Sequence, residues 1–237
     1  MKNQVVLITG AAKRMGRAIA LACVKQGALV AIHYGESAED AQQTAAECGG
    51  APIFRANLES VAEIRDLFAR VHKHFGRLDA LVNNAARFTK FNPLEVEETD
   101  WDFIHSVNLK ATFFACQAAA RIMLSQPEGG RIVNISSLGG IQPWSEHAHY
   151  CASKAGVIMM TRALSKAWAP LIAVNSVAPG VIPFGKYDDR IHRLIAATPA
   201  QREGTGEDIA EAVLFYLQAT KFITGQVTAV DGGLSQR

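Results

Sequence analysis

The chain has 237 residues, of which 49% are hydrophobic and 19% are charged, as in a globular domain with a full core. Its 24 Lys and Arg against 22 Asp and Glu give a formal charge of +2, which favours neither nucleic acid nor an anionic membrane as partner. The sequence carries no signal-peptide pattern, no apolar run of transmembrane length and four scattered cysteines, so we expect a cytoplasmic protein without a metal site.

Short apolar runs alternate with amphipathic stretches along the whole chain. Seven runs rich in Val, Ile and Leu predict buried strands at 5–9, 28–33, 52–55, 80–83, 131–136, 173–177 and 226–230. Helical patterns lie between them, at about 16–26, 38–48, 60–75, 99–125, 149–168 and 207–218. This order predicts one α/β domain over residues 1–237, a Rossmann-type, doubly wound, parallel seven-stranded sheet with helices on both faces. The irregular stretch before the last helix is expected to form a substrate lid at about 181–206.

The first strand runs directly into a glycine-containing loop, Thr9 to Gly16, which opens the first helix. Gly10 permits a tight turn, and Gly16 lets the helix start approach a ligand. The helix N-terminus then offers N–H groups and a partial positive charge to a pyrophosphate. A loop of this kind on the first strand-to-helix turn predicts a dinucleotide site.

The end of the second strand indicates which dinucleotide is bound. An acidic residue usually stands there to bind the ribose 2′-OH, but this chain has Tyr34, with Lys13 and Arg14 in the loop nearby. This arrangement favours a 2′-phosphate, and therefore NADPH over NADH, with His33 and Ser37 as further donors. Glu36 opposes this preference because its charge repels a phosphate.

A Tyr–Lys pair lies at helical spacing in the helix predicted at 149–168. Tyr150 and Lys154 are four residues apart and share one helix face. An ammonium near a phenol stabilises the phenolate and lowers its pKa. Ser137 follows the fifth strand, at the sheet edge where open α/β sheets bind ligands, and Asn84 follows the fourth. These residues predict an acid–base site at that edge.

The motifs together resemble the short-chain dehydrogenase/reductase family over nearly the whole chain. They are T-G-x-x-x-x-x-G, N-N-A, the Asn of V-N-L, I-S-S, Y-x-x-x-K, A-P-G and V-D-G-G. The resemblance implies Tyr150 as acid/base, Lys154 as ribose ligand and pKa modifier, and Ser137 as the donor that orients the substrate. It implies Asn108 as the residue that holds a proton-relay water. Ser136 is then a structural neighbour, because thirteen residues separate Ser137 from Tyr150, which is the usual family spacing.

The same resemblance implies the cofactor contacts and the assembly. The expected cofactor-binding residues are Gly10, Lys13, Arg14, Met15, Gly16, His33, Tyr34, Ser37, Asn57, Leu58, Asn84, Ala85, Tyr150, Lys154, Pro179, Gly180 and Ile182. The C-terminal strand and the long helices at 99–125 and 149–168 resemble the family's subunit interfaces, so we expect a homotetramer. The chain departs from the family at Arg14, Asn57, Ala86 and Phe184, which stand where Gly, Asp, Gly and Thr are usual.

Within the family, the loop Thr9 to Arg17, the strand end His33-Tyr34-x-x-Ser37 and the segment Asn84 to Phe88 resemble pteridine reductases and dihydromonapterin reductase-like members. This likeness implies reduction of a C=N or C=O group, with a dihydropterin as substrate. The expected substrate contacts are Phe88, Ser137, Trp144, Tyr150 and Phe184. Two alternatives stay open: a 3-oxoacyl-thioester or general carbonyl reductase, and a non-catalytic nucleotide-sensing protein. Phe88 either stacks on the substrate or packs on the lid.

Overall fold

The computed structural model describes residues 1–185 and 189–236. One parallel sheet of seven strands runs through it, in the order β3-β2-β1-β4-β5-β6-β7. This arrangement confirms the predicted doubly wound α/β fold. The strands are β1 Val5–Ile8, β2 Leu29–Tyr34, β3 Ile53–Arg55, β4 Ala80–Asn83, β5 Gly130–Ile135, β6 Ile172–Pro179 and β7 Val227–Val230.

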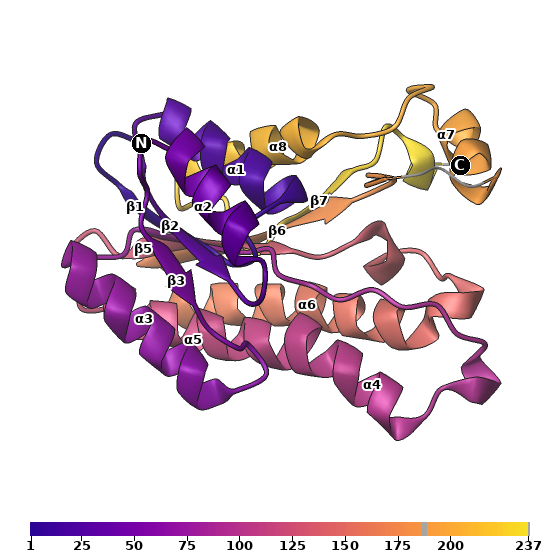
Figure 1. Ribbon diagram of the computed structural model, residues 1–237, viewed down its shortest axis with the longest axis horizontal. Helices are drawn as coiled ribbons and strands as arrows, with labels where there is room; N and C mark the ends of the chain where they lie inside the picture. The colour runs from indigo at the N-terminus through magenta and orange to yellow at the C-terminus, as the bar shows by residue number, and fades with distance from the viewer. Residues whose placement is uncertain (186–188, 237) are drawn as a thin grey trace.

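Helices cover both faces of this sheet, as Figure 1 shows. One face carries α1 Arg14–Lys25, α2 Ala38–Glu47 and α8 Gly206–Gln218. The other carries α3 Val61–Phe75, α4 Glu98–His105, α5 Thr112–Met123 and α6 Ala148–Trp168. Each face has its own buried apolar cluster, because strands covered on both sides turn apolar side chains both ways.

Two segments differ from the sequence prediction. The single helix expected at 99–125 is divided into α4 and α5 by a π-helical segment, Ser106–Ala111, which contains Asn108. Hydrophobic periodicity continues across such an insertion, so the pattern does not reveal it, and π-helical turns occur often at functional sites. The stretch expected to be an irregular lid contains a helix, α7 Asp189–Ala197, while residues 186–188 lie outside the described part.

The strand order places a ligand crevice at one edge of the sheet. The chain proceeds outward from β1 to β2 and β3, then returns to β4 on the other side of β1. Helices leave the carboxyl ends of β1 and β4 in opposite directions, and such a switch point is where open α/β sheets bind ligands. Among the described helices, none is both long and apolar enough to span a membrane.

Candidate active site

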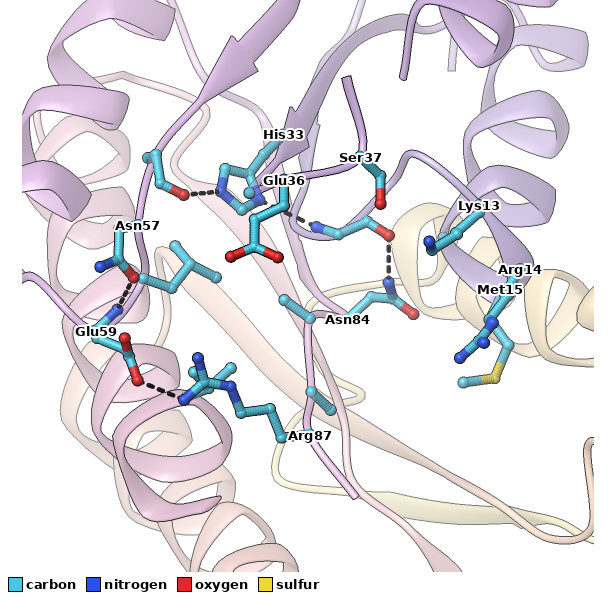
Figure 2. Close-up of a pocket in the computed structure, with 18 of the residues that line it drawn as sticks. Lys13, Arg14, Met15, His33, Glu36, Ser37, Asn57, Glu59, Asn84 and Arg87 are labelled. Carbon is cyan, nitrogen blue, oxygen red and sulfur yellow. Dashed lines mark hydrogen bonds and ion pairs between the residues drawn. The ribbon is translucent and has the colours of Figure 1, made fainter. Parts of the chain in front are cut away.

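A cavity of about 680 Å³ lies at this switch point, beside the carboxyl ends of β1 to β4. Figure 2 shows its walls, with Lys13, Arg14 and Met15 on one side and Asn57, Glu59 and Arg87 on the other. Its lining contains most of the predicted cofactor-binding residues: Gly10, Lys13, Arg14, Met15, Gly16, His33, Ser37, Asn57, Leu58, Asn84 and Ala85. Tyr34, Tyr150, Lys154, Pro179, Gly180 and Ile182 are outside that lining, and Phe184 is part of it.

The first turn has the shape that a pyrophosphate needs. Gly10 has a φ of 63°, in the left-handed region that favours glycine. A Cβ on Gly16 would lie 2.2 Å from the Gly10 carbonyl oxygen and 2.7 Å from Asn84 Nδ2, so only glycine fits there. Lys13 precedes α1 without a side-chain cap, which leaves the helix start available to an anion. These features fit a dinucleotide cofactor.

Arg14 takes the place of a family glycine and keeps a glycine-like conformation. Its φ is 56°, a region that residues with a Cβ rarely adopt. Its guanidinium lies 5.4 Å from the centre of the Phe184 ring, which places a cation and an aromatic side chain together at the cavity. The sequence departures at residues 14 and 184 are therefore in contact with each other.

His33 supports the turn and has no free nitrogen for a phosphate. Its Nδ1 accepts a hydrogen bond from the Gly10 N–H at 3.1 Å, and its Nε2 lies 3.1 Å from the Ala56 carbonyl oxygen. Burial lowers the pKa of His33 to about 4, so the ring is neutral at neutral pH. The expectation that His33 donates to a 2′-phosphate is wrong for this arrangement, because main-chain groups occupy both nitrogens.

The charges near Ser37 are partly balanced. Lys13 Nζ lies 3.3 Å from a carboxylate oxygen of Asp40, in the first turn of α2. Glu36 lines the same end of the cavity, where its carboxylate is visible in Figure 2. Lys13 is therefore paired with Asp40, which was not foreseen from the sequence, and Glu36 is a second acidic side chain at the same end of the cavity.

Tyr150 is buried on α6, with Ser137 beside it. A hydrogen bond from Ser137 opposes the rise in the Tyr150 pKa, but burial dominates and raises that pKa to about 12. Ser137 Oγ also accepts from the Gly139 N–H at 3.0 Å, which orients the hydroxyl. Ser136 instead donates to the Val177 carbonyl oxygen and lies 2.7 Å from Ser176 Oγ. The structure thus pairs Ser137 with Tyr150 and gives Ser136 a structural place.

Lys154 is buried on the next turn of α6. Its Nζ donates to the Ile135 carbonyl oxygen at 2.9 Å and lies 5.9 Å from the centre of the Tyr150 ring. Burial lowers the Lys154 pKa to about 8. The expected lowering of the Tyr150 pKa by this ammonium is not what the structure gives. Desolvation of the phenolate outweighs it while Lys154 is bound to the main chain.

Asn108 is 1% exposed and held on three sides. Its Oδ1 accepts from the Arg87 N–H at 2.7 Å, and its Nδ2 donates to the Arg87 carbonyl oxygen at 2.9 Å. Nδ2 also lies 3.2 Å from Ser153 Oγ, which donates to the Tyr150 carbonyl oxygen at 2.7 Å. Asn108 and Tyr150 are therefore joined through Ser153.

Aromatic rings surround the exposed side of Tyr150. Phe88 is 56% exposed and meets the Tyr150 ring edge-on, at 4.8 Å between centres. Its face stacks on His147 at 4.6 Å, a contact that the sequence did not suggest. Trp144 lies parallel to the Tyr150 ring at 6.2 Å. These three predicted substrate residues, Phe88, Trp144 and Tyr150, are therefore neighbours.

The sequence reasoning missed several cavity residues. They end or follow β3, or belong to α4 and the π-helical segment: Arg55, Glu59, Phe103 and Val107. Arg55 and Glu59 flank Asn57 just past a strand's carboxyl end, which was a usable signal. Phe103 and Val107 gave none, because their pattern is that of an ordinary amphipathic helix.

Comparisons with known proteins identify the family. The family described as enoyl-(acyl carrier protein) reductase matches residues 10–235. A 3-oxoacyl-[acyl-carrier-protein] reductase of Synechocystis is 34% identical over 98% of this chain and 96% of its own. A 2-dehydro-3-deoxy-D-gluconate 5-dehydrogenase of Escherichia coli is 32% identical over the same shares, 98% and 96%.

Solved structures agree with this assignment. A putative short-chain alcohol dehydrogenase from Sinorhizobium meliloti has a TM-score of 0.94 and 33% identity, covering 100% of this chain and 98% of that one. A mutant Serratia marcescens short-chain dehydrogenase/reductase has a TM-score of 0.92 and 30% identity, covering 99% and 98%. The closer likeness to pteridine reductases is not shown by these relatives. The chain belongs to the short-chain dehydrogenase/reductase family and is a nicotinamide-dependent oxidoreductase, not a non-catalytic nucleotide sensor.

Proposed function

We propose that the enzyme is an NADPH-dependent reductase of a carbonyl group, with 3-oxoacyl thioesters as its first substrate class. The contact between the Tyr150 phenol and the Ser137 hydroxyl carries this proposal, because it places two groups that can donate a hydrogen bond beside one site for a carbonyl oxygen. The 3-oxoacyl reductases among the relatives, 34% and 35% identical, support the substrate class.

The residues divide the proton chemistry between them, while the bound nicotinamide cofactor supplies the hydride. Tyr150 donates its phenolic proton to the carbonyl oxygen as the C–O single bond forms. Ser137 donates a hydrogen bond to the same oxygen and orients it. The family resemblance gives Lys154 the cofactor ribose as its partner and Asn108 a water that returns a proton toward Tyr150. Lys154 suits such a transfer because its pKa, about 8, is close to neutral pH.

NADPH is the proposed cofactor because Lys13, Arg14 and Ser37 line one end of the cavity. Two cations and a hydroxyl suit a 2′-phosphate, which forms charge-assisted hydrogen bonds. Glu36 and Asp40 act against it, so we expect a preference over NADH that is clear but limited in size.

A dihydropterin is the second candidate substrate, and the aromatic wall favours it. The Phe88 ring is half exposed and held against His147, with its edge contact to Tyr150. A flat heterocycle next to such a ring gains about 0.5–1.5 kcal/mol beyond burial. The Lys13-Arg14 loop, shared with pteridine reductases, supports the same class.

One panel separates these substrates. NADPH oxidation is followed with acetoacetyl thioester, dihydrobiopterin, dihydromonapterin, dihydrofolate and simple quinones, with Tyr150→Phe as the blank. Turnover of the thioester alone supports the first candidate, and turnover of a pterin alone replaces it with the second. The absence of Tyr150-dependent turnover on every carbonyl and pterin would overturn the proposed function.

We further propose a cytoplasmic homotetramer. Met159 on α6 is 61% exposed and Phe222 before β7 is 95% exposed, on the two regions that resemble the family's subunit interfaces. Subunit interfaces in these two regions would cover both side chains. The four free cysteines suit a reducing compartment. Light scattering at micromolar concentration tests the assembly, and a stable monomer would contradict it.

A further inference from the structure

Arg87, in the loop after β4, contacts two other parts of the chain through its side chain. Its guanidinium forms an ion pair with Glu59, beyond β3, as Figure 2 shows. Nη1 also donates to the Phe103 carbonyl oxygen at 3.1 Å, and the guanidinium lies 3.9 Å from the centre of the Phe103 ring. We call Arg87, Glu59 and Phe103 the Arg87 brace. It links the loops after β3 and β4 to the last turns of α4.

The main chain of the same residue holds Asn108. The N–H and carbonyl of Arg87 exchange two hydrogen bonds with the Asn108 side chain, at 2.7 and 2.9 Å. One residue therefore fixes the Asn108 amide through its backbone and fixes the preceding helix through its side chain. The Asn108 amide continues to Ser153, whose hydroxyl donates to the Tyr150 carbonyl oxygen.

The location of Asn108 makes such a brace useful. Asn108 lies in the π-helical segment Ser106–Ala111, directly after α4. A π-helical segment lacks the regular hydrogen bonds of an α-helix, so tertiary contacts decide where its side chains point. The Arg87 side chain is 27% exposed and Glu59 is 41% exposed, so the ion pair is partly screened and its geometry matters more than its charge.

We propose that Arg87 is a positioning residue for Asn108 and that Glu59 anchors it across the cavity; this inference rests on the proposed reductase function. In the proposed mechanism Arg87 itself transfers no proton. Its guanidinium suits the task better than an ammonium does, because a planar fork bonds and stacks at the same time. Arg87 then contributes both to the wall of the cavity and to the position of Asn108 in the proton relay.

A competing role has a different signature. Arg87 and Glu59 both line the cofactor cavity, so a role in cofactor affinity alone is the competing explanation. A cofactor-wall role changes the Kd for NADPH and leaves kcat with saturating cofactor unchanged. A positioning role lowers kcat and leaves the Kd nearly unchanged.

The experiment compares Arg87→Met, Arg87→Lys and Glu59→Gln in the full-length enzyme. The matched control is Arg77→Met, which removes an Arg–carboxylate pair with Asp79 at the opposite edge of the sheet. We expect Arg87→Met to lower kcat by roughly 10–100-fold, because small misplacements of a catalytic group have effects of this size. Arg87→Lys should recover part of that loss, Glu59→Gln should show a smaller loss, and the solvent deuterium isotope effect on kcat should rise in Arg87→Met.

NADPH binding is measured by nucleotide fluorescence, and thermal unfolding is measured beside it. A Kd within about threefold of wild type, with kcat reduced, supports positioning. A raised Kd with unchanged kcat assigns the pair to the cofactor wall and overturns the proposal. Equal effects of Arg87→Met and Arg77→Met on Tm, with kcat retained in both, reduce Arg87 to a structural role and also overturn it.

A readout without turnover separates this inference from the proposed function. The Asn108 side-chain amide is observed by NMR in ¹⁵N-asparagine-labelled enzyme and assigned by its loss in Asn108→Ser. Protection of this amide from exchange in wild type and in Arg77→Met, but not in Arg87→Met, supports the brace whatever the substrate is. Equal protection in all three overturns it, even if the reductase function holds.

Discussion

Nδ1 of His33, at the end of β2, accepts a hydrogen bond from the main-chain N–H of Gly10 at 3.1 Å. The opposite nitrogen lies 3.1 Å from the Ala56 carbonyl oxygen and, as the donor there, must carry the ring proton. The imidazole therefore connects the first turn to the loop after β3, and it performs both bonds only while neutral. A second proton on Nδ1 would place two donors face to face at the turn that starts the cofactor site.

We expect stability to fall in mild acid because of His33. Its pKa in the folded chain is about 4, below its ordinary value of 6.5, so the unfolded chain binds more protons between these pH values. The free energy of unfolding should therefore decrease as pH falls from about 6.5 to about 4, by up to ~3 kcal/mol. Urea titrations across this range measure it.

His33→Gln is the control for that slope, since glutamine has a donor and an acceptor but does not titrate in this range. His149 adds a smaller slope of the same sign, because burial lowers its pKa too. The variant should lose the part of the slope that His33 contributes and keep the rest, to which Glu59 and Asp231 also contribute near pH 4 because their pKa values are lowered in the folded chain. An unchanged slope in His33→Gln would remove His33 from the explanation.

Tyr150→Phe should lower turnover by about 10²–10⁴-fold, because general acid catalysis contributes that much. The ring contacts with Phe88 and Trp144 need no hydroxyl, so the fold and NADPH binding should persist. Steady-state kinetics with nucleotide fluorescence check both points. Ser136→Ala provides a comparison, since its hydroxyl bonds only toward β6. That variant should keep its turnover, and near-normal turnover in Tyr150→Phe would refute the assignment.

Gly16→Ala should destabilise the chain, since its Cβ would lie 2.2 Å from the Gly10 carbonyl oxygen. Overpacking of this kind costs about 1–3 kcal/mol, measurable as a lower free energy of unfolding in urea. Gly35→Ala is matched to it, because a Cβ there meets nothing within 4 Å. Equal stability of the two variants would mean that the turn at Gly10 shifts at little cost to accommodate the added Cβ.

Asp40→Asn should increase the preference for NADPH over NADH, because it releases Lys13 from its ion pair. Exposed pairs of this kind contribute about 0.2–1 kcal/mol, so the ratio of kcat/KM values for the two cofactors should rise by a factor of roughly 1.4 to 5. Glu39→Gln, one residue away on α2, controls for a general change in charge. A ratio that moves equally in both variants would argue against a specific role of Asp40.

The fold followed from sequence pattern because each strand is a short apolar run between helical stretches, and β1 to β7 all lie where these runs predicted. The loop after β1 and the helix that carries Tyr150 could be predicted equally well, because both the glycine positions and the i, i+4 spacing are read from local sequence. The break between α4 and α5 was not predictable, because it depends on what Asn108 bonds to across the fold.

Pairings between distant residues account for the remaining differences. Tyr34 and Ile182 are in the right segments, but their side chains do not line the cavity. His33 was identified as a site residue, yet its bonds go to Gly10 and Ala56. Residue type indicated which groups can act, while only the folded chain shows which partner each one meets.

The residues that line the cavity come mostly from the first half of the chain. Among the residues that the structure describes, Phe184 is the one wall residue that comes from beyond Val107. Tyr150, Ser137 and Trp144 all belong to the later portion. We therefore expect a chimaera joined within the π-helical segment to take its nucleotide preference from one parent and its choice of carbonyl substrate from the other. Most of the cavity wall is therefore encoded by the first half of this chain, and the acid–base residues are encoded by the second.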